Sequence, residues 1–313
     1  MDHRGRSQFS QHGDPRPNQP PGDAAKMGLS PSARPTPLRP SYPRVAYTFL
    51  RNSLVRDMTF RANFLIDTIS SMVWVLMNLG FYVLIFEYTP MIGAGTGWGK
   101  YEFFLFLGTT LIINSITRGL FLANAVELSE HIRNGTLDFI LLKPIDTQFL
   151  VSLGRIEWSA LGPLGFGVLL ILYSFGHLGY VPGPVTVVLY VFYLVCGCAI
   201  YYSLMIAMSS TAIWFGRNQS LLDFWFYITN FSRYPMEIYR GPWGDPLRWT
   251  FTFLVPVLVA VNIPARMLVR PLDIRTAADW TLPAFTIAAT LAGLVVSRWI
   301  FRRALVSYRS ASS

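Results

Sequence analysis

The chain has 313 residues, of which 52% are hydrophobic, 15% aromatic and only 14% charged, with a positive mean hydropathy. Soluble domains carry about 25% charged residues, so this composition excludes an ordinary soluble protein and indicates a membrane protein. The net charge of +9 does not indicate nucleic-acid binding, because the basic residues gather in the N-terminal tail, in polar loops and near the C-terminus. That distribution suits a lipid membrane surface.

The N-terminal region differs from the rest of the chain. Residues 1–43 hold nine prolines and no apolar run, so little can be buried and we predict a disordered tail. Residues 44–61 are compatible with a helix on the membrane surface that leads into the first span. Its apolar positions recur at spacings of three and four residues: Tyr47, Leu50, Leu54 and Met58. We predict one membrane domain over residues 44–309.

Six apolar segments predict an all-α membrane protein with six transmembrane helices. Crossing about 30 Å of hydrocarbon requires about 20 helical residues. The segments cover approximately residues 62–86, 103–124, 161–178, 185–215, 220–231 and 282–301, and the fifth is the shortest. Arginines precede the first segment, follow the fourth at Arg217 and close the chain, so both termini are predicted to face the cytoplasm.

Trp249 to Met267 form a further apolar segment, interrupted by Pro256 and Pro264. Counting this segment as a seventh crossing would place the C-terminal arginines outside, against the positive-inside rule. We therefore predict an external re-entrant helical hairpin between spans five and six, with Pro256 or Asn262 near its turn. Non-helical backbone at membrane depth has to be covered by protein or water.

Three charged residues lie inside the predicted spans, where charge is costly. Asp67, Arg118 and Asp223 fall at a similar depth, about 8–9 Å inside the cytoplasmic boundary at about 1.5 Å per residue. We predict that Arg118 pairs with Asp67 or Asp223. A structural clasp between helices is favoured over a role in substrate or proton passage.

A ridge of small residues on the fourth span recurs at intervals of four: Ala199, Ser203, Ala207 and Thr211. Small side chains on one ridge allow another helix to approach closely. We therefore predict a helix-packing face, with a substrate-lining face as the alternative.

Motifs for chemistry within this chain are not found. Ala94 to Tyr101 reads A-G-T-G-W-G-K-Y, but Ala94 replaces the first glycine of a phosphate-binding loop and Tyr101 replaces its Ser or Thr. The four histidines are too scattered to indicate a metal site. We expect no catalytic residue, no cofactor and no metal.

The polar segment Ile132 to Pro144, between the second and third spans, predicts a second short helix. Gly135 can adopt positive φ and end the preceding helix, and Thr136 can cap the new one. Leu137, Ile140 and Leu141 would form its apolar face, which could insert into a groove on a soluble partner. An interfacial elbow that touches only lipid head groups is the alternative. The residues assigned to partner coupling are Gly135, Leu137, Asp138, Leu141, Lys143 and Pro144.

In these segments the chain resembles the ABC-2 type permeases, the membrane subunits of ATP-binding-cassette exporters. The resemblance covers approximately residues 44–308. It is carried by R-N-G-T-L-D-F-I-L-L-K-P at 133–144, A-N-F-L-I-D at 62–67, R-Y-P-M-E-I-Y at 233–239, F-T-F-L-V-P at 251–256 and N-I-P-A at 262–265.

The resemblance implies an exporter subunit in the inner (plasma) membrane, with a coupling helix and a re-entrant hairpin. Two such subunits, as a homo- or heterodimer, would pair with separate ATPase subunits that hydrolyse ATP. The alternative is an ion-coupled secondary transporter using Asp67 and Asp223, but the internal inverted repeat typical of such proteins is not detected. A lipid-modifying enzyme is a second alternative, but it would need clustered acids or histidines facing the interface, and the sequence has no such cluster. The residues do not indicate which substrate is transported.

Overall fold

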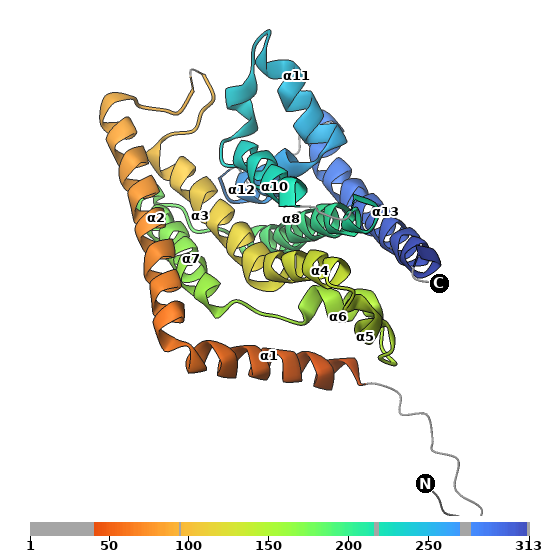
Figure 1. Cartoon of the computed structure of the whole chain (residues 1–313). Helices are drawn as coiled ribbons and strands as arrows, with labels where there is room; N and C mark the ends of the chain where they lie inside the picture. The colour runs from red at the N-terminus through yellow and green to blue at the C-terminus, as the bar shows by residue number, and fades with distance from the viewer. Residues whose placement is uncertain (1–40, 94, 216–218, 270–276, 312–313) are drawn as a thin grey trace, which may run out of the picture. The chain divides into compact units, whose positions relative to one another are not determined.

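The computed structural model describes residues 41–93, 95–215, 219–269 and 277–311, which all belong to the unit Pro40–Ser313. The tail predicted over residues 1–43 lies outside the described residues up to position 40, and so does Arg217. In the described residues every regular element is helical (Figure 1), which confirms the all-α prediction.

The elements follow one another without strands in this part of the chain. They are α1 (Tyr42–Thr59), α2 (Arg61–Tyr88), α3 (Lys100–Thr117), the π-helical turn η1 (Arg118–Leu122), α4 (Ala123–Arg133), α5 (Leu137–Leu141), α6 (Thr147–Leu153), η2 (Trp158–Ala160), α7 (Leu161–Leu178), α8 (Pro184–Ser210), α9 (Ala212–Phe215), α10 (Gln219–Phe231), η3 (Met236–Tyr239), α11 (Gly244–Trp249), the π-helical turn η4 (Thr250–Leu254), α12 (Val257–Val269), η5 (Ala277–Trp280) and α13 (Thr281–Ala311).

Five helical stretches are long and apolar enough to cross a membrane, and they match five of the six predicted spans. They are Arg61–Tyr88, Lys100–Arg133, Trp158–Leu178, Pro184–Trp214 and Thr281–Tyr308. The predicted span over residues 220–231 is not among these five stretches and stays a prediction. It corresponds to α10, whose 13 residues reach only about 20 Å.

The sixth candidate span is the bent pair formed by Gly244–Leu254 and Val257–Val269, whose axes meet at 88°. The break falls at Val255 and Pro256, so Pro256 lies at the turn as predicted, whereas Asn262 lies within α12. Nearly every side chain of α12 is buried in the chain itself. Protein therefore covers α12, whereas Val255 and Pro256 at the break are half-buried. Non-helical backbone at membrane depth has to be covered by protein or water.

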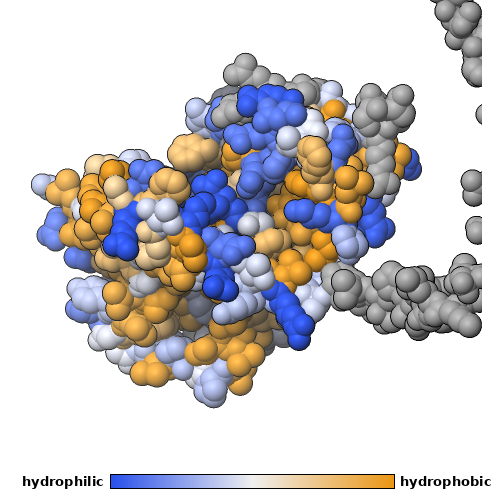
Figure 2. Space-filling model, turned by 60° about the horizontal axis from the view of Figure 1, so that its bottom comes forward, coloured by the Kyte–Doolittle hydropathy of each residue, from blue (hydrophilic) through white to orange (hydrophobic). Residues whose placement is uncertain are grey.

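Helix α1 runs across the N-terminal end of α2 instead of continuing it (Figure 1). This helix matches the one predicted from residue 44 and begins two residues earlier, at Tyr42. Only Ser53 is buried, and the predicted apolar stripe is exposed over its whole length: Tyr47, Leu50, Leu54 and Met58. The surface near α1 and α5 mixes hydrophobic patches with hydrophilic side chains that gather across its middle (Figure 2).

Glycines allow two pairs of long helices to touch through their backbones. A Cβ atom built on Gly167 of α7 would lie 2.9 Å from the carbonyl oxygen of Gly108 on α3. On α8, a Cβ at Gly197 would lie 2.2 Å from the carbonyl oxygen of Ala260 in α12. Because no side chain fits at such contacts, glycine sets these crossings, as small residues do between membrane helices.

The predicted small-residue ridge of α8 meets α13 at one point. Ser203 is buried, and a Cβ built on Gly293 of α13 would lie 3.3 Å from the Ser203 Cβ atom. Ala199, Ala207 and Thr211 are half-buried, so packing along the whole ridge stays a prediction.

Polar contacts fix α12 to the turn before α11. The buried Glu237 of η3 forms an ion pair with Arg266 of α12 and accepts a 3.1 Å hydrogen bond from the Trp98 indole. The backbone N–H of Met236 donates to the Asn262 side chain at 2.8 Å. The Trp98 bond also joins this turn to a segment 139 positions earlier in the chain.

Candidate functional site

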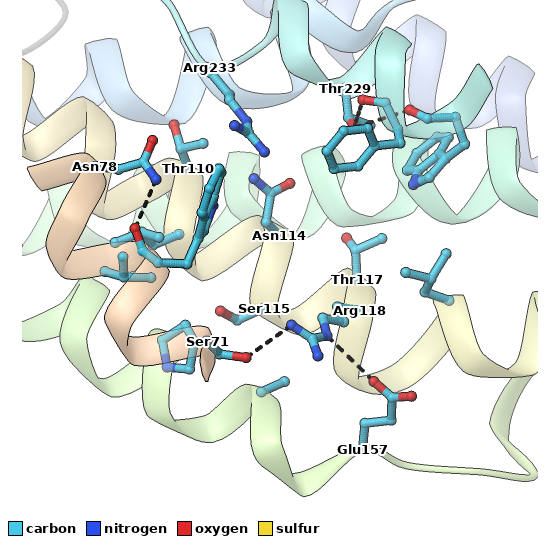
Figure 3. Close-up of a pocket in the computed structure, with 18 of the residues that line it drawn as sticks. Ser71, Asn78, Thr110, Asn114, Ser115, Thr117, Arg118, Glu157, Thr229 and Arg233 are labelled. Carbon is cyan, nitrogen blue, oxygen red and sulfur yellow. Dashed lines mark hydrogen bonds and ion pairs between the residues drawn. The ribbon is translucent and has the colours of Figure 1, made fainter. Parts of the chain in front are cut away.

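A cavity of about 680 Å³ opens among α2, the α3–η1–α4 helix, the loop before α7, and α10 (Figure 3). Each long helix contributes one face to it, since the lining positions recur every three or four residues. From α2 these are Ser71, Trp74, Val75, Asn78 and Tyr82. From α3 and η1 they are Leu107, Thr110, Leu111, Asn114, Ser115, Thr117, Arg118 and Leu122.

The cavity lining is amphipathic. Hydroxyl and amide groups come mainly from α2 and α3, whereas the aromatic surface is supplied by Trp74, Tyr82, Trp225 and Phe226. The charged residues of the lining are Arg118, Arg155, Glu157 and Arg233. In the described ranges, no group of three or more His, Cys, Asp or Glu side chains is arranged to hold a metal ion. The lining therefore offers hydrogen bonds, positive charge and apolar surface to a ligand.

Arg118 starts the π-helical turn that interrupts the long helix from Lys100 to Arg133. Single π-helical turns within α-helices occur frequently at functional sites. The Arg118 Nη1 atom donates to the Ser71 hydroxyl at 3.1 Å, and its Nε atom lies 3.5 Å from the Glu157 carboxylate. Arg118 thus connects α2, η1 and the loop before α7, as drawn in Figure 3.

The ionic partner of Arg118 differs from the prediction. Asp67 and Asp223 are both exposed, and among the described residues neither forms an ion pair with Arg118. Equal depth along separate helices does not ensure that two side chains face one another, which explains the error. Glu157 lies in a polar loop four residues before the third span, outside the segments searched for intramembrane charge.

The loop that carries Glu157 is held by several backbone bonds. The Glu157 N–H donates to the Gly119 carbonyl at 2.8 Å. The side-chain amide of Asn124 donates to the Arg155 carbonyl at 2.6 Å and accepts from the Arg155 N–H at 2.8 Å. A side chain that pairs with both backbone groups of one residue leaves the loop little freedom, so Glu157 is placed beside Arg118.

Helix α1 also contacts this loop through two polar side chains that sequence reasoning missed. The Ile156 N–H donates to the Ser53 hydroxyl at 3.1 Å, and the Trp158 N–H donates to the Asp57 carboxylate at 3.3 Å. Ser53 and Asp57 are four residues apart and therefore share one face of α1. This four-residue spacing of polar side chains is the feature of the sequence that could have indicated the contact with the loop.

The short helix predicted after α4 is present as α5. Gly135 has φ of +67° and ends the preceding helix as expected. Thr136 occupies the N-cap position, but its side chain makes no capping bond. Its hydroxyl instead lies 2.7 Å from the His131 ring, so the predicted capping role is wrong.

The apolar face of α5 is turned toward the chain itself. Leu137 is completely buried in a cluster with Leu128, Val151 and Phe301, and Leu141 packs against the same cluster. The predicted contact between Leu137 and a partner protein is therefore wrong in this structure. Helical spacing brings the two leucines onto one face, and the ends of α4, α6, α8 and α13 already cover that face.

Different apolar side chains project from the other side of the α5 segment. Phe139 is 70% exposed and Leu142 is 81% exposed. Gly135, Asp138, Lys143 and Pro144 are also exposed. We call the exposed residues Asp138, Phe139, Leu142, Lys143 and Pro144 the α5 tip. Two large apolar groups on a small, internally anchored protrusion form a candidate contact surface.

A polar network connects the segment after the α5 tip to two long helices. Asp146 caps α6 by accepting from the Phe149 N–H at 3.0 Å, and it forms an ion pair with Arg298 of α13. Arg298 also donates to Gln148 at 2.7 Å, and Gln148 donates to the Tyr202 hydroxyl of α8 at 2.9 Å. Hydrogen bonding from Arg298 holds the pKa of the Asp146 carboxyl below its ordinary value.

Long apolar helices, a bent apolar pair whose second helix is buried, and an amphipathic cavity between the helices define a multi-pass membrane protein of the transport class. The chain belongs to the ABC-2 family of transporter proteins, since the model of that family matches residues 72–312. It is thus a membrane component of an ABC transporter. No curated protein and no solved structure matches the chain.

Proposed function

We propose that this chain is the permease subunit of an ABC exporter in the inner (plasma) membrane. Both termini face the cytoplasm, and a separate ATP-binding-cassette ATPase supplies the energy. A second permease subunit, either a copy of this chain or a similar one, completes the transport path. Family membership over residues 72–312 supports the permease assignment.

The exposure of Phe139 and Leu142 on an anchored protrusion is the observation that carries the ATPase docking proposal. Exposed apolar side chains on a short helix can enter a groove of a soluble protein. Burial of Leu137 on the opposite side keeps α5 attached to the permease when the partner moves. The α5 tip is therefore the proposed coupling surface, with the exposed Gly135 at the start of the segment and Leu141 packed beneath it.

Movement of the α5 tip has a direct route into the membrane domain. Helix α6 follows α5 immediately, and its capping residue Asp146 is bound to Arg298 of α13. Through Gln148 the same segment contacts Tyr202 of α8. Because α8 packs against both α12 and α13, a displacement near α5 reaches helices on two sides of the chain.

Membrane placement follows from the exposed faces. The apolar stripe of α1 would lie among lipid head groups at the cytoplasmic surface, where amphipathic helices bind. The bent pair would enter from the external side and return, with Pro256 at its turn and α12 enclosed by the other helices. Ion-coupled transport through Asp67 and Asp223 has no comparable support, since neither carboxylate is among the residues that line the described cavity.

The docking proposal is tested by co-purification. The tagged chain is co-expressed with each candidate ATP-binding-cassette ATPase of its source organism, and each pair is reconstituted in lipid nanodiscs. We expect the double variant Phe139→Asp, Leu142→Asp to lose the ATPase and its stimulated ATP hydrolysis, with an unchanged melting temperature.

Phe60→Asp provides the matched control, since Phe60 is 61% exposed at the corner between α1 and α2. This variant should retain the ATPase. Equal ATPase recovery with the double variant and the wild type would contradict docking at the α5 tip. Hydrolysis of ATP by the purified chain alone would contradict the proposed division of labour.

A further inference from the structure

The charges of the cavity do not balance. Three arginines and one glutamate line it, which leaves a formal charge of +2 from +3 and −1. Glu157 lies against Arg118, at 3.5 Å from its Nε atom. In the portion of the chain that the structure describes, no carboxylate lies within 4.0 Å of the Arg155 or Arg233 guanidinium. The excess positive charge is therefore available to a ligand.

Arg233 is the arginine of the cavity that we expect to contact a bound anion. It follows α10 directly, is half-buried, and its guanidinium carbon lies 5.8 Å from the centre of the Phe226 ring. In Figure 3 its guanidinium points toward Asn114 of α3, inside the cavity. A positive charge in a membrane domain is costly without a partner. The planar guanidinium suits carboxylate and phosphate groups, to which it can donate two parallel hydrogen bonds.

The rest of the lining suits an extended molecule with an apolar part. Along α3, the lining runs from Leu107 to Arg118, which is about 16 Å at 1.5 Å per residue. Trp74 of α2 and Phe226 of α10 are each more than half exposed at the cavity. Aromatic surfaces of this kind accommodate hydrocarbon, whereas Asn114 and Ser115 offer hydrogen bonds to a polar group.

We propose that the cavity binds an anionic amphiphile, with Arg233 as the principal contact for its phosphate or carboxylate head group and the aromatic lining as the site of its hydrocarbon chain. Arg118 adds a second positive charge to the site, and Glu157 partly neutralises that charge. The proposal rests on the permease function proposed above and names the substrate class of that permease.

Binding to the purified full-length chain tests the proposal without requiring transport. Native mass spectrometry in detergent compares a phosphatidic acid with a phosphatidylcholine of the same acyl chains and with a fatty acid. We expect the anionic lipids to bind more tightly than phosphatidylcholine. Arg233→Gln should weaken phosphatidic acid binding by about tenfold or more, the effect of losing a hydrogen bond to a charged group.

Two variants control for folding and for surface charge. Arg233→Lys keeps the charge and should retain most of the binding. Arg302→Gln removes an exposed arginine of α13 that is not among the cavity-lining residues, and it should have no effect. Equal binding of anionic and zwitterionic lipids, or unchanged binding in a folded Arg233→Gln variant, would overturn the proposal.

Competition with inorganic phosphate separates the two possible sources of the anion. We expect no displacement at concentrations at which phosphatidic acid competes fully, because the apolar chain contributes to binding. Equal displacement by both would overturn the amphiphile and leave a site for a free anion. If the wild-type chain binds lipid selectively but does not bind the ATPase, only the proposed function is contradicted. If the wild-type chain binds the ATPase but does not bind lipid selectively, only this inference is contradicted.

Discussion

Arg298 of α13 donates a hydrogen bond of 3.0 Å to Asp146, the residue that caps α6, across 152 positions of the sequence. Through this contact the segment that follows the α5 tip is attached to the C-terminal helix. The same guanidinium reaches Gln148, whose amide contacts Tyr202 of α8. A force applied to α5 therefore meets a bonded connection to two long helices instead of a flexible loop.

The Asp146–Arg298 pair predicts a defined pH dependence of stability. The pKa of Asp146 is lowered by Arg298, so the pair stabilises the fold fully above the pKa of an unfolded aspartate, about 3.9. This contribution is lost as the pH falls through the lower pKa of the folded state. Asp146→Asn removes the charge but retains a good N-cap residue.

We expect the melting temperature of Asp146→Asn to lie below that of the wild type from about pH 7 down to about pH 4, and the two to converge below that range. Thermal unfolding in detergent across this pH series measures the difference. A difference that does not shrink in acid would show that the charge of Asp146 is not responsible.

Truncation of Leu137 is predicted to lower the free energy of unfolding strongly, and truncation of Leu142 is predicted to leave it almost unchanged. Leu137→Ala removes a completely buried side chain and should lower the free energy of unfolding by about 2–5 kcal/mol. Leu142→Ala alters a side chain that is 81% exposed and should change it by less than about 0.5 kcal/mol. Thermal unfolding of both variants decides this. Similar stabilities would mean that α5 does not pack as described.

Two glycines of α7 form a matched pair for testing the contact between α3 and α7. Gly167→Ala places a Cβ atom 2.9 Å from the Gly108 carbonyl oxygen, so the helices have to separate, at a cost of about 1–3 kcal/mol. Gly165→Ala meets no atom within 4 Å and should be neutral or stabilising by up to about 1 kcal/mol. The yield of folded protein and the melting temperature provide the comparison, and equal losses in both variants would contradict it.

Double-mutant cycles distinguish the partner of Arg118 found in the structure from the one predicted. Arg118→Gln and Glu157→Gln remove groups 3.5 Å apart, so their effects on stability should be coupled by about 0.5 kcal/mol or more. Arg118→Gln and Asp67→Asn should be additive within about 0.5 kcal/mol. Coupling to Asp67 with additivity to Glu157 would favour the original pairing.

Several features were predictable because local sequence determines them. Hydrophobic length alone located five long helices, and Gly135 and Pro256 marked breaks that follow from their own backbone preferences. Apolar composition also placed the predicted span over residues 220–231 on α10, which with 13 residues is shorter than the five long stretches. Motif order also identified the family, which the match over residues 72–312 confirms.

The partner of Arg118, the burial of Leu137 and the cavity could not be read in the same way. Apolar spacing shows that Leu137 and Leu141 share a face, but not whether that face meets this chain or another protein. Likewise, depth along a helix leaves its rotation undetermined, so a similar predicted depth of Asp67 and Asp223 did not show that Arg118 pairs with Glu157 instead.

The sequence by itself determined which segments are helical, which are apolar enough for a membrane, and where glycine and proline interrupt them, because hydrophobicity and backbone preference act over a few neighbouring residues. Only the tertiary structure decided which faces meet. Helix rotation depends on contacts such as Gly167 with Gly108 and Glu157 with Arg118, which join residues about 40 to 60 positions apart and depend on the packing of all the helices together.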